Sequence, residues 1–340
     1  MGSTKRKLIL SSIMLAMTFT CLTSTTYAWF ARNKEAWTEE FNFDIDNYDG
    51  LLISIDGKNF TASINNQNLK KACVAKIHNI DILADSQSSS PVLTNDFVDT
   101  EFAKIKIDGV TTSDGAYFST IDRFNGTDGY YNVVEANKYS YLAFDLYFTV
   151  ESSRIADKSY DVAFVSTSHS EQSDSNMPIS RITSPDNLMN VYSQFTVNNT
   201  TYNSGDKIKS KTCDAMRIGV NHGDIFTIYE PNIGLGSYCL EGATNDIHNP
   251  ANNYMLQHLN AYGEYNLKPL VDSNNIYANT EKNFDGEISL GKITPVDNTD
   301  YSVVKITVSI WLEGYDSDYL SPADLTELSC FLSFFKKEAL

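Results

Sequence analysis

The chain has 340 residues, of which 42% are hydrophobic and 20% charged, and it contains 20 Tyr and 18 Phe. This apolar and aromatic content excludes disorder over most of the length. The formal net charge of -17 repels phosphate backbones, and no basic stripe with interleaved aromatic residues offsets it, so nucleic-acid binding is disfavoured.

The first 28 residues have the organisation of a secretory leader. Three basic residues at 5–7 precede an apolar run at 8–22, and small residues lead up to Ala28. This pattern predicts signal-peptidase cleavage after Ala28. The alternative is an uncleaved membrane anchor that extends through Phe30. In both cases the body is predicted to lie outside the cytoplasmic membrane, either secreted or held at the cell surface through the leader alone.

Beyond the leader, apolar residues recur at every second position, as in strands with one buried face. Shorter stretches of this kind occur at 41–45, 53–55, 105–107, 162–164, 218–220 and 332–334, and the longest at 142–150 and 304–312. Turn-forming Asp-Gly pairs such as Asp56-Gly57 separate several of them. One-sided alternation is typical of antiparallel sheets packed face to face. The predicted fold class is therefore mainly all-β, an antiparallel β-sandwich.

A few short helices are expected in crossovers or at the ends of the sandwich. Three segments combine a capping side chain with a proline at the first helical position: residues 184–195, 249–262 and 321–328. We interpret residues 29–340 as one elaborated sandwich whose first and last strands pair. Two independent domains are the alternative, since the Ser-rich stretches at 85–90 and 166–184 are typical of exposed loops or linkers.

Four cysteines remain beyond the leader: Cys73, Cys213, Cys239 and Cys330. In an exported chain they allow two disulfides in three connectivities. A Cys213–Cys239 bridge would close the shortest loop and is the favoured pairing. The alternative is four buried free thiols.

The sequence lacks the motifs that carry catalysis or cofactor binding. No two histidines have the i, i+4 spacing of a zinc-binding helix, and neither G-x-S-x-G nor a phosphate-binding glycine pattern is present. We therefore expect a protein that is not an enzyme and that carries no cofactor.

Two acidic groups are candidates for chemistry. Asp44, Asp46 and Asp49, followed by a glycine, resemble the start of a calcium loop, although Tyr48 stands where a third ligand belongs. A second group, Glu313, Asp316 and Asp318, follows a predicted strand. Solvated turns explain both groups as well. A hydrolytic carboxylate pair is a further alternative, which the sequence does not place.

Exposed aromatic residues on a secreted sandwich can stack on sugar rings. Tyr130, Tyr131 and Trp311 are the candidates for this role. Packing within the protein or at an interface is the competing interpretation.

Three motifs resemble a known group of exported proteins. The junction Thr25-Thr26-Tyr27-Ala28-Trp29-Phe30 is similar to the signal peptides of the TasA/camelysin proteins of Gram-positive bacteria. The late strand 306–314, ITVSIWLEG, and the mid-chain pair Met216-Arg217-Ile218 and Tyr229-Glu230-Pro231-Asn232 resemble features of exported proteins with this leader. The matches cover about 30 residues of the chain.

This resemblance implies a jelly-roll sandwich whose copies build extracellular fibres by donating a strand to an open sheet edge. A mature N-terminus starting at Trp29, followed by the alternating segment 41–45, could act as the donor. The alternative is that this segment pairs within its own sheet.

Three classes of function follow from these observations. The first is a non-enzymatic surface or matrix protein that associates with itself or with other surface proteins. The second is an extracellular module that binds a glycan or calcium. The third is a secreted hydrolase.

Overall fold

The computed structural model describes part of the chain, in many short ranges: 42–47, 50–112, 117–122, 132–150, 158–164, 180–190, 195–197, 200–203, 205–223, 225–232, 239–240, 267–268, 276–278, 289–296, 300–314, 318 and 328–339. Residues 42–340 form one compact unit, separate from residues 1–41. The predicted leader and its cleavage site at Ala28 lie outside the described residues.

Sheet A joins the two ends of this unit. Its described strands are β1 (Asn42–Asn47), β3 (Ser63–Ile64), β8 (Tyr160–Phe164), β9 (Arg181–Thr183), β19 (Ser289–Ile293) and β21 (Ser329–Glu338). They are ordered β19-β8-β21-β1-β3, with β9 also paired to β21. The first and last described strands, β1 and β21, lie side by side and parallel. The predicted pairing of the terminal strands is thus confirmed, although it is parallel in a mainly antiparallel protein.

Sheet B contains the two longest predicted strands. Its described strands are β2 (Leu51–Ser54), β4 (Gly109–Thr111), β5 (Ser119–Asp122), β6 (Asn132–Glu135), β7 (Leu142–Val150), β14 (Met216–His222), β15 (Ile225–Tyr229), β18 (Ile276–Ala278) and β20 (Val304–Glu313). Strand β20 pairs with β14 on one side and with both β7 and β4 on the other. Along β7, buried residues alternate with half-buried ones, as the period-2 pattern predicts.

The core lies between the two sheets. Phe148 of sheet B packs on Phe334 of sheet A with ring centroids 4.9 Å apart. Phe164 of sheet A meets Tyr229 of sheet B at 5.4 Å. These contacts close a largely antiparallel β-sandwich, which confirms the predicted fold class, and burial of their apolar surface stabilises it.

One predicted helix is wrong. Residues 184–195 contain strand β10 (Asp186–Asn190), which pairs antiparallel with β13 (Lys207–Lys211). The two expected capping residues have other partners: Ser184 Oγ accepts the amide of Cys213 at 3.0 Å, and Asp186 forms ion pairs with lysines of β13. These long-range contacts override the local start signal. Residues 249–262 and 321–327 lie outside the described part of the chain.

The remaining described elements are small. Two short ladders pair β11 (Phe195–Val197) with β12 (Thr200–Tyr202), and β16 (Cys239–Leu240) with β17 (Leu267–Lys268). A 3-10 turn, η3 (Thr212–Ala215), precedes β14. The predicted strand at 105–107 is not formed, although Ile105 and Ile107 are both buried.

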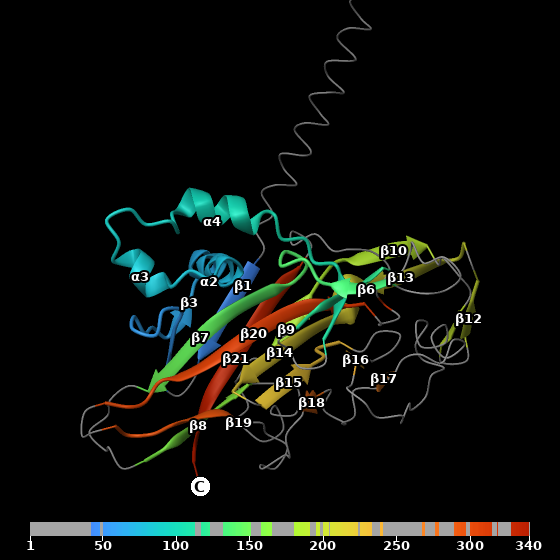
Figure 1. The fold of residues 1–340 in the computed structure, drawn as a ribbon. Helices are drawn as coiled ribbons and strands as arrows, with labels where there is room; N and C mark the ends of the chain where they lie inside the picture. The colour runs from blue at the N-terminus through green and yellow to red at the C-terminus, as the bar shows by residue number, and fades with distance from the viewer. Residues whose placement is uncertain are drawn as a thin grey trace, which may run out of the picture. The chain divides into compact units, whose positions relative to one another are not determined.

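Three helices between β3 and β4 were not predicted: α2 (Asn66–His78), α3 (Ile82–Ser86) and α4 (Asn95–Phe102). They lie together beside β7 (Figure 1). A side chain caps the N-terminus of each helix by accepting hydrogen bonds from backbone N–H groups. The capping residues are Asn65 for α2, Asp81 for α3 and Thr94 for α4. The predicted loop at 85–90 is exposed from Ser86 onward, whereas Asp85 is buried and accepts bonds from the amides of the chain that follows.

Candidate functional site

A groove runs along the outer face of sheet B, the face turned away from sheet A. Its first cavity, of about 520 Å³, lies between helices α2 and α3 and strands β7 and β20. A second cavity, of about 480 Å³, reaches from α2 across β7 and β20 to β14. Lys76 of α2 lines both cavities, so we call them together the outer groove.

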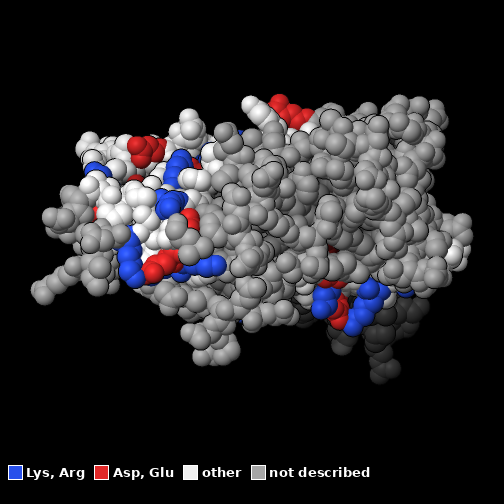
Figure 2. Space-filling model, turned by 90° about the horizontal axis from the view of Figure 1, so that it is seen from below, with Lys and Arg blue, Asp and Glu red and all other residues white. Residues whose placement is uncertain are grey.

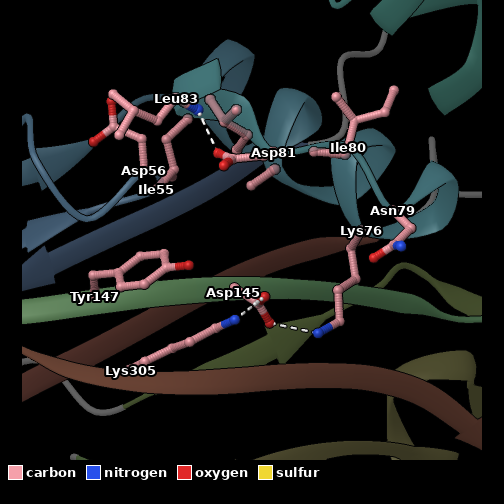
Figure 3. A pocket seen from close by; sticks show the side chains of 13 residues that line it. Ile55, Asp56, Lys76, Asn79, Ile80, Asp81, Leu83, Asp145, Tyr147 and Lys305 are labelled. Atoms are coloured by element: carbon pink, nitrogen blue, oxygen red, sulfur yellow. Dashed lines mark hydrogen bonds and ion pairs between the residues drawn. The ribbon is translucent and has the colours of Figure 1, made fainter. Parts of the chain in front are cut away.

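Asp145 of β7 is the centre of the first cavity (Figure 3). Its carboxylate accepts a bond from Lys76 Nζ at 2.7 Å and pairs with Lys305 Nζ at 2.8 Å. Thr307 Oγ1 donates a third bond at 2.7 Å. Helix α2 and strands β7 and β20 are therefore joined through one carboxylate.

The electrostatics of this cluster favour the charged forms of Asp145 and Lys305. Burial alone raises the pKa of Asp145, but the bonds from Lys305, Lys76 and Thr307 outweigh burial, and the net pKa lies below the usual value. Burial acts to lower the pKa of Lys305, yet Asp145 raises it overall. Lys76 and Lys305 neutralise the carboxylate of Asp145, so these charged groups of the first cavity are paired with one another.

The other acids of the first cavity also serve the local fold. Asp81 accepts the amide of Leu83 at 2.9 Å at the start of α3. Asp56 accepts the amides of Lys58 and Asn59 in the predicted Asp-Gly turn, and although burial opposes it, these bonds lower the pKa of Asp56 to about 2.

The second cavity has two small residues, Ala143 and Ser309, in its strand-side lining. Ala143, Ser309 and Gly219 stand opposite one another on β7, β20 and β14. Tyr141, stacked on Phe118 with ring centroids 4.1 Å apart and planes inclined by 20°, forms an aromatic wall. Among the described residues that line this cavity, none is acidic.

A separate cluster ties the helices to the edge of sheet B. Glu101 of α4 accepts bonds from Tyr139 Oη at 2.7 Å and from Lys104, and it lies 2.9 Å from His78 Nε2 at the end of α2. Lys104, Tyr139 and His78, in that order of effect, lower the pKa of Glu101 to about 2. This cluster links α2, the helix that lines the outer groove, to α4.

The mid-chain and late-strand motifs meet on adjacent strands. Arg217 of β14 stands opposite Trp311 of β20, and its Nη2 lies 2.8 Å from Glu230 Oε1. Trp311 Nε1 donates to Glu313 Oε2 at 3.1 Å. All four side chains are 0% exposed.

This burial corrects two sequence-based interpretations. Trp311 cannot present its ring to a sugar, because Phe118 packs edge-on against it at 5.5 Å. Glu313 is not in a solvated turn, and neither is Asp318, which is buried and bonded by Ser210 Oγ at 3.0 Å. Asp316, Tyr130 and Tyr131 lie outside the described residues.

The predicted calcium ligands lie partly on a strand. Asp44 and Asp46 belong to β1, where they stand opposite Phe331 and Ser333 of β21. This stretch is extended rather than looped, which differs from the calcium-loop interpretation. Asp49 is outside the described residues, so calcium binding here stays a prediction. Within the described ranges, no three His, Cys, Asp or Glu residues form a group that could hold a metal ion.

Cys213, one partner of the favoured disulfide, is a free buried thiol. Its Sγ lies 3.7 Å from Asp214 Oδ1. Cys73 and Cys330 are also free and buried. The side chain of Cys239 lies outside the described part. The structure therefore shows no Cys213–Cys239 bridge, and three of the four cysteines match the alternative of buried thiols.

On the face seen in Figure 2, the described acidic and basic side chains lie intermixed. In the described part of the chain, no helix is long and apolar enough to span a bilayer.

Known protein families, curated proteins and solved structures give no match to this chain. The TasA/camelysin resemblance therefore stays a prediction.

Sequence reasoning missed the outer groove altogether. Lys76, which lines both cavities from the helix side, belongs to a helix that was not predicted. The strand side of the groove depends on which residues of β7, β20 and β14 become neighbours. The available signals were local: Asn65 as a cap, Lys76 and His78 in the last helical turn, and Asn79 as the left-handed residue at the helix end.

Proposed function

We propose that the chain is an exported, non-enzymatic structural protein of the cell surface or extracellular matrix whose copies associate by exchanging strand β1. The observation that carries this proposal is the place of β1 in sheet A. This N-terminal strand is inserted between β21 and β3, with six residues paired to β21 and two to β3.

A strand in this position can be replaced by the same strand of a second copy. Exchange substitutes an identical intermolecular ladder for the intramolecular one, so all pairings and the burial of Ile45, which is 1% exposed, are retained. If β1 leaves, β21 presents an unpaired edge over residues 329–334, which is a template for another chain.

The connection after β1 suits this exchange. Only residues 48–50 separate β1 in sheet A from β2 in sheet B, and Gly50 has a φ of 73°. Short hinge connections invite exchange of the strand between copies when closure within one copy strains them. When exchange runs head to tail, each copy donates β1 to the next, and successive copies can extend into a fibre.

Two other classes of function are weighed against this one. A hydrolase would need carboxylates that solvent and substrate can reach. Glu313 and Asp318 do not meet this need, because both are buried. Binding of a small ligand keeps support from the second cavity of the outer groove, whose volume of about 480 Å³ lies in the usual range of ligand sites.

Cysteine trapping on the full chain tests the strand exchange. Asn42 and Ser329 are paired across β1 and β21, so a double variant, Asn42→Cys with Ser329→Cys, should form a disulfide between copies when exchange occurs. We expect covalent dimers and longer ladders on non-reducing gels, increasing with protein concentration. Electron microscopy of the same samples should show fibres.

The matched control is Ser119→Cys with Glu135→Cys, a pair on the neighbouring strands β5 and β6. These strands are local in sequence and should link only within one copy. If the β1–β21 pair also links only within single copies at concentrations where fibres form, strand exchange is not the mode of assembly.

A further inference from the structure

The second cavity of the outer groove has two cationic groups on its rim, in a chain whose net charge is -17. Lys138 is exposed and forms no ion pair with any described residue; its Nζ lies 5.2 Å from the ring centroid of Tyr139. Lys76 Nζ contacts Asp145 and Thr307. Since an ammonium group has three N–H donors, one remains for a ligand.

Neutral hydrogen-bonding groups also line the cavity. Thr307 and Ser309 of β20 and Asn221 of β14 all line the cavity. Within the described part of the chain, the amide of Asn221 has no side-chain partner. Such groups match the hydroxyls of a polyol better than an apolar body.

The aromatic wall supplies a flat apolar surface. Tyr141 is half-buried and is held against Phe118, which in turn packs on Trp311. Burial raises the pKa of Tyr141, so its phenol stays protonated at neutral pH. Tyr141 also lines the cavity, and an aromatic ring held in this way favours stacking of a second ring.

We propose that the second cavity binds an acidic saccharide, with the sugar carboxylate at Lys76 and Lys138, the ring against Tyr141, and the hydroxyls at Asn221 and Thr307. None of the described lining residues is acidic, which disfavours cations as ligands, and the hydroxyl and amide groups of the lining disfavour purely apolar ligands. This site is independent of strand β1, so its binding and the proposed self-association can succeed or fail separately.

Calorimetric titration of the full chain at low ionic strength tests the site. The probes are digalacturonate, its neutral counterpart digalactose, and acetate. We expect digalacturonate to bind with a Kd of roughly 0.1–1 mM, more tightly than both others, and more weakly as salt is added. If digalactose binds as tightly as digalacturonate, the lysines have no role in binding. If acetate binds as tightly as digalacturonate, the sugar ring has none.

Charge reversal at the rim locates the site. Lys138→Glu should weaken digalacturonate binding by about tenfold or more, as a lost charge pair of about 1.4 kcal/mol would. Lys292→Glu, a matched exposed lysine on β19 of the other sheet, should leave the affinity unchanged. Circular dichroism checks that both variants fold. Unchanged binding in Lys138→Glu, or the lack of any binding at roughly 10 mM digalacturonate, overturns the proposal.

Discussion

Arg217 of β14 and Glu230, which follows β15, form an ion pair that solvent does not reach: Nη2 lies 2.8 Å from Oε1, and both side chains are 0% exposed. Arg217 Nη1 also donates to the carbonyl of Met216 at 3.2 Å. Removing both charges from water is costly, so such a pair contributes little net stability when intact. Losing one partner, by contrast, leaves an uncompensated buried charge.

The first prediction follows from this asymmetry. Glu230→Gln should lower the free energy of unfolding by roughly 3–5 kcal/mol, the cost of breaking a buried pair, as measured by urea denaturation. The control is Lys158→Gln, which removes an ion pair with Glu338 whose two side chains are 51% and 59% exposed. It should change stability far less. Similar losses in both variants would mean that the Arg217 site is solvated in solution.

Asp145 should make stability depend on pH. Because its pKa in the folded state is lowered, it stabilises the fold above its unfolded pKa of about 3.9, and this contribution is lost as the pH falls through the folded value. Asp145→Asn should therefore lower the free energy of unfolding by about 1–2 kcal/mol at pH 7. The difference from the unaltered protein should shrink at pH 3. A difference that stays constant between the two pH values would contradict the assignment.

Glu101 should titrate well below an ordinary glutamate. Its pKa is lowered to about 2 by Lys104, Tyr139 and His78, which carbon-detected NMR of the side-chain carboxyl can follow. Tyr139→Phe removes the bond to Glu101 Oε2 and should raise this pKa, while Tyr117→Phe, at an exposed tyrosine, should not. Titration near pH 4 in the unaltered protein would show that the cluster is open in solution.

Gly291 is a position where a side chain does not fit. Its φ is 142°, and a Cβ there would lie 2.5 Å from Val304 Cγ1 and 3.1 Å from His222 Nε2. We expect Gly291→Ala to destabilise the fold by about 1–3 kcal/mol, measured by thermal and urea unfolding. Gly205→Ala is the control. The φ of Gly205 is also positive, at 88°, but a Cβ added there would meet no neighbouring atom within 4 Å. A loss no greater than that of the control would show that the clash is relieved.

The buried thiols should be chemically inert in the native state. Burial raises the pKa of Cys73 and Cys330 far above the usual value, and burial also raises that of Cys213. Because the thiolate is the reactive form, iodoacetamide should label none of the three at pH 8 until the protein unfolds. Mass spectrometry of labelled peptides distinguishes the sites. Rapid labelling of Cys73 in native protein would contradict its burial within helix α2.

Strand β7 shows what a local pattern can predict. Its bounds, Leu142–Val150, and its buried face follow from strict alternation alone, because side chains of a strand point to opposite faces. Helix α2 shows the limit. Its buried residues Leu69, Ala72, Cys73, Val74 and Ala75 are small or spread around the helix, so no clear apolar stripe marks it.

Strand β10 shows how a long-range partner can reverse a local preference. Ser184 and Asp186 have the residue types of a helix start, but Asp186 pairs with lysines of β13 and Ser184 accepts the amide of Cys213 in the 3-10 turn that follows that strand. The interpretation of Trp311 as a sugar-stacking residue is wrong for a related reason. Alternation correctly separates it from the core-facing residues of β20, but it does not reveal that Phe118, nearly 200 residues earlier in the sequence, covers the outer face there.

By itself, the amino-acid sequence determined that this chain is β-rich, where its longest strands lie and which of their faces is buried, because alternation acts over neighbouring residues. Only the tertiary structure decided that β1 runs parallel to β21, that Arg217 meets Glu230, and that small residues of three strands line up beneath Lys76. Those relationships depend on register between segments far apart in the chain, and register is set by the contacts of the complete fold.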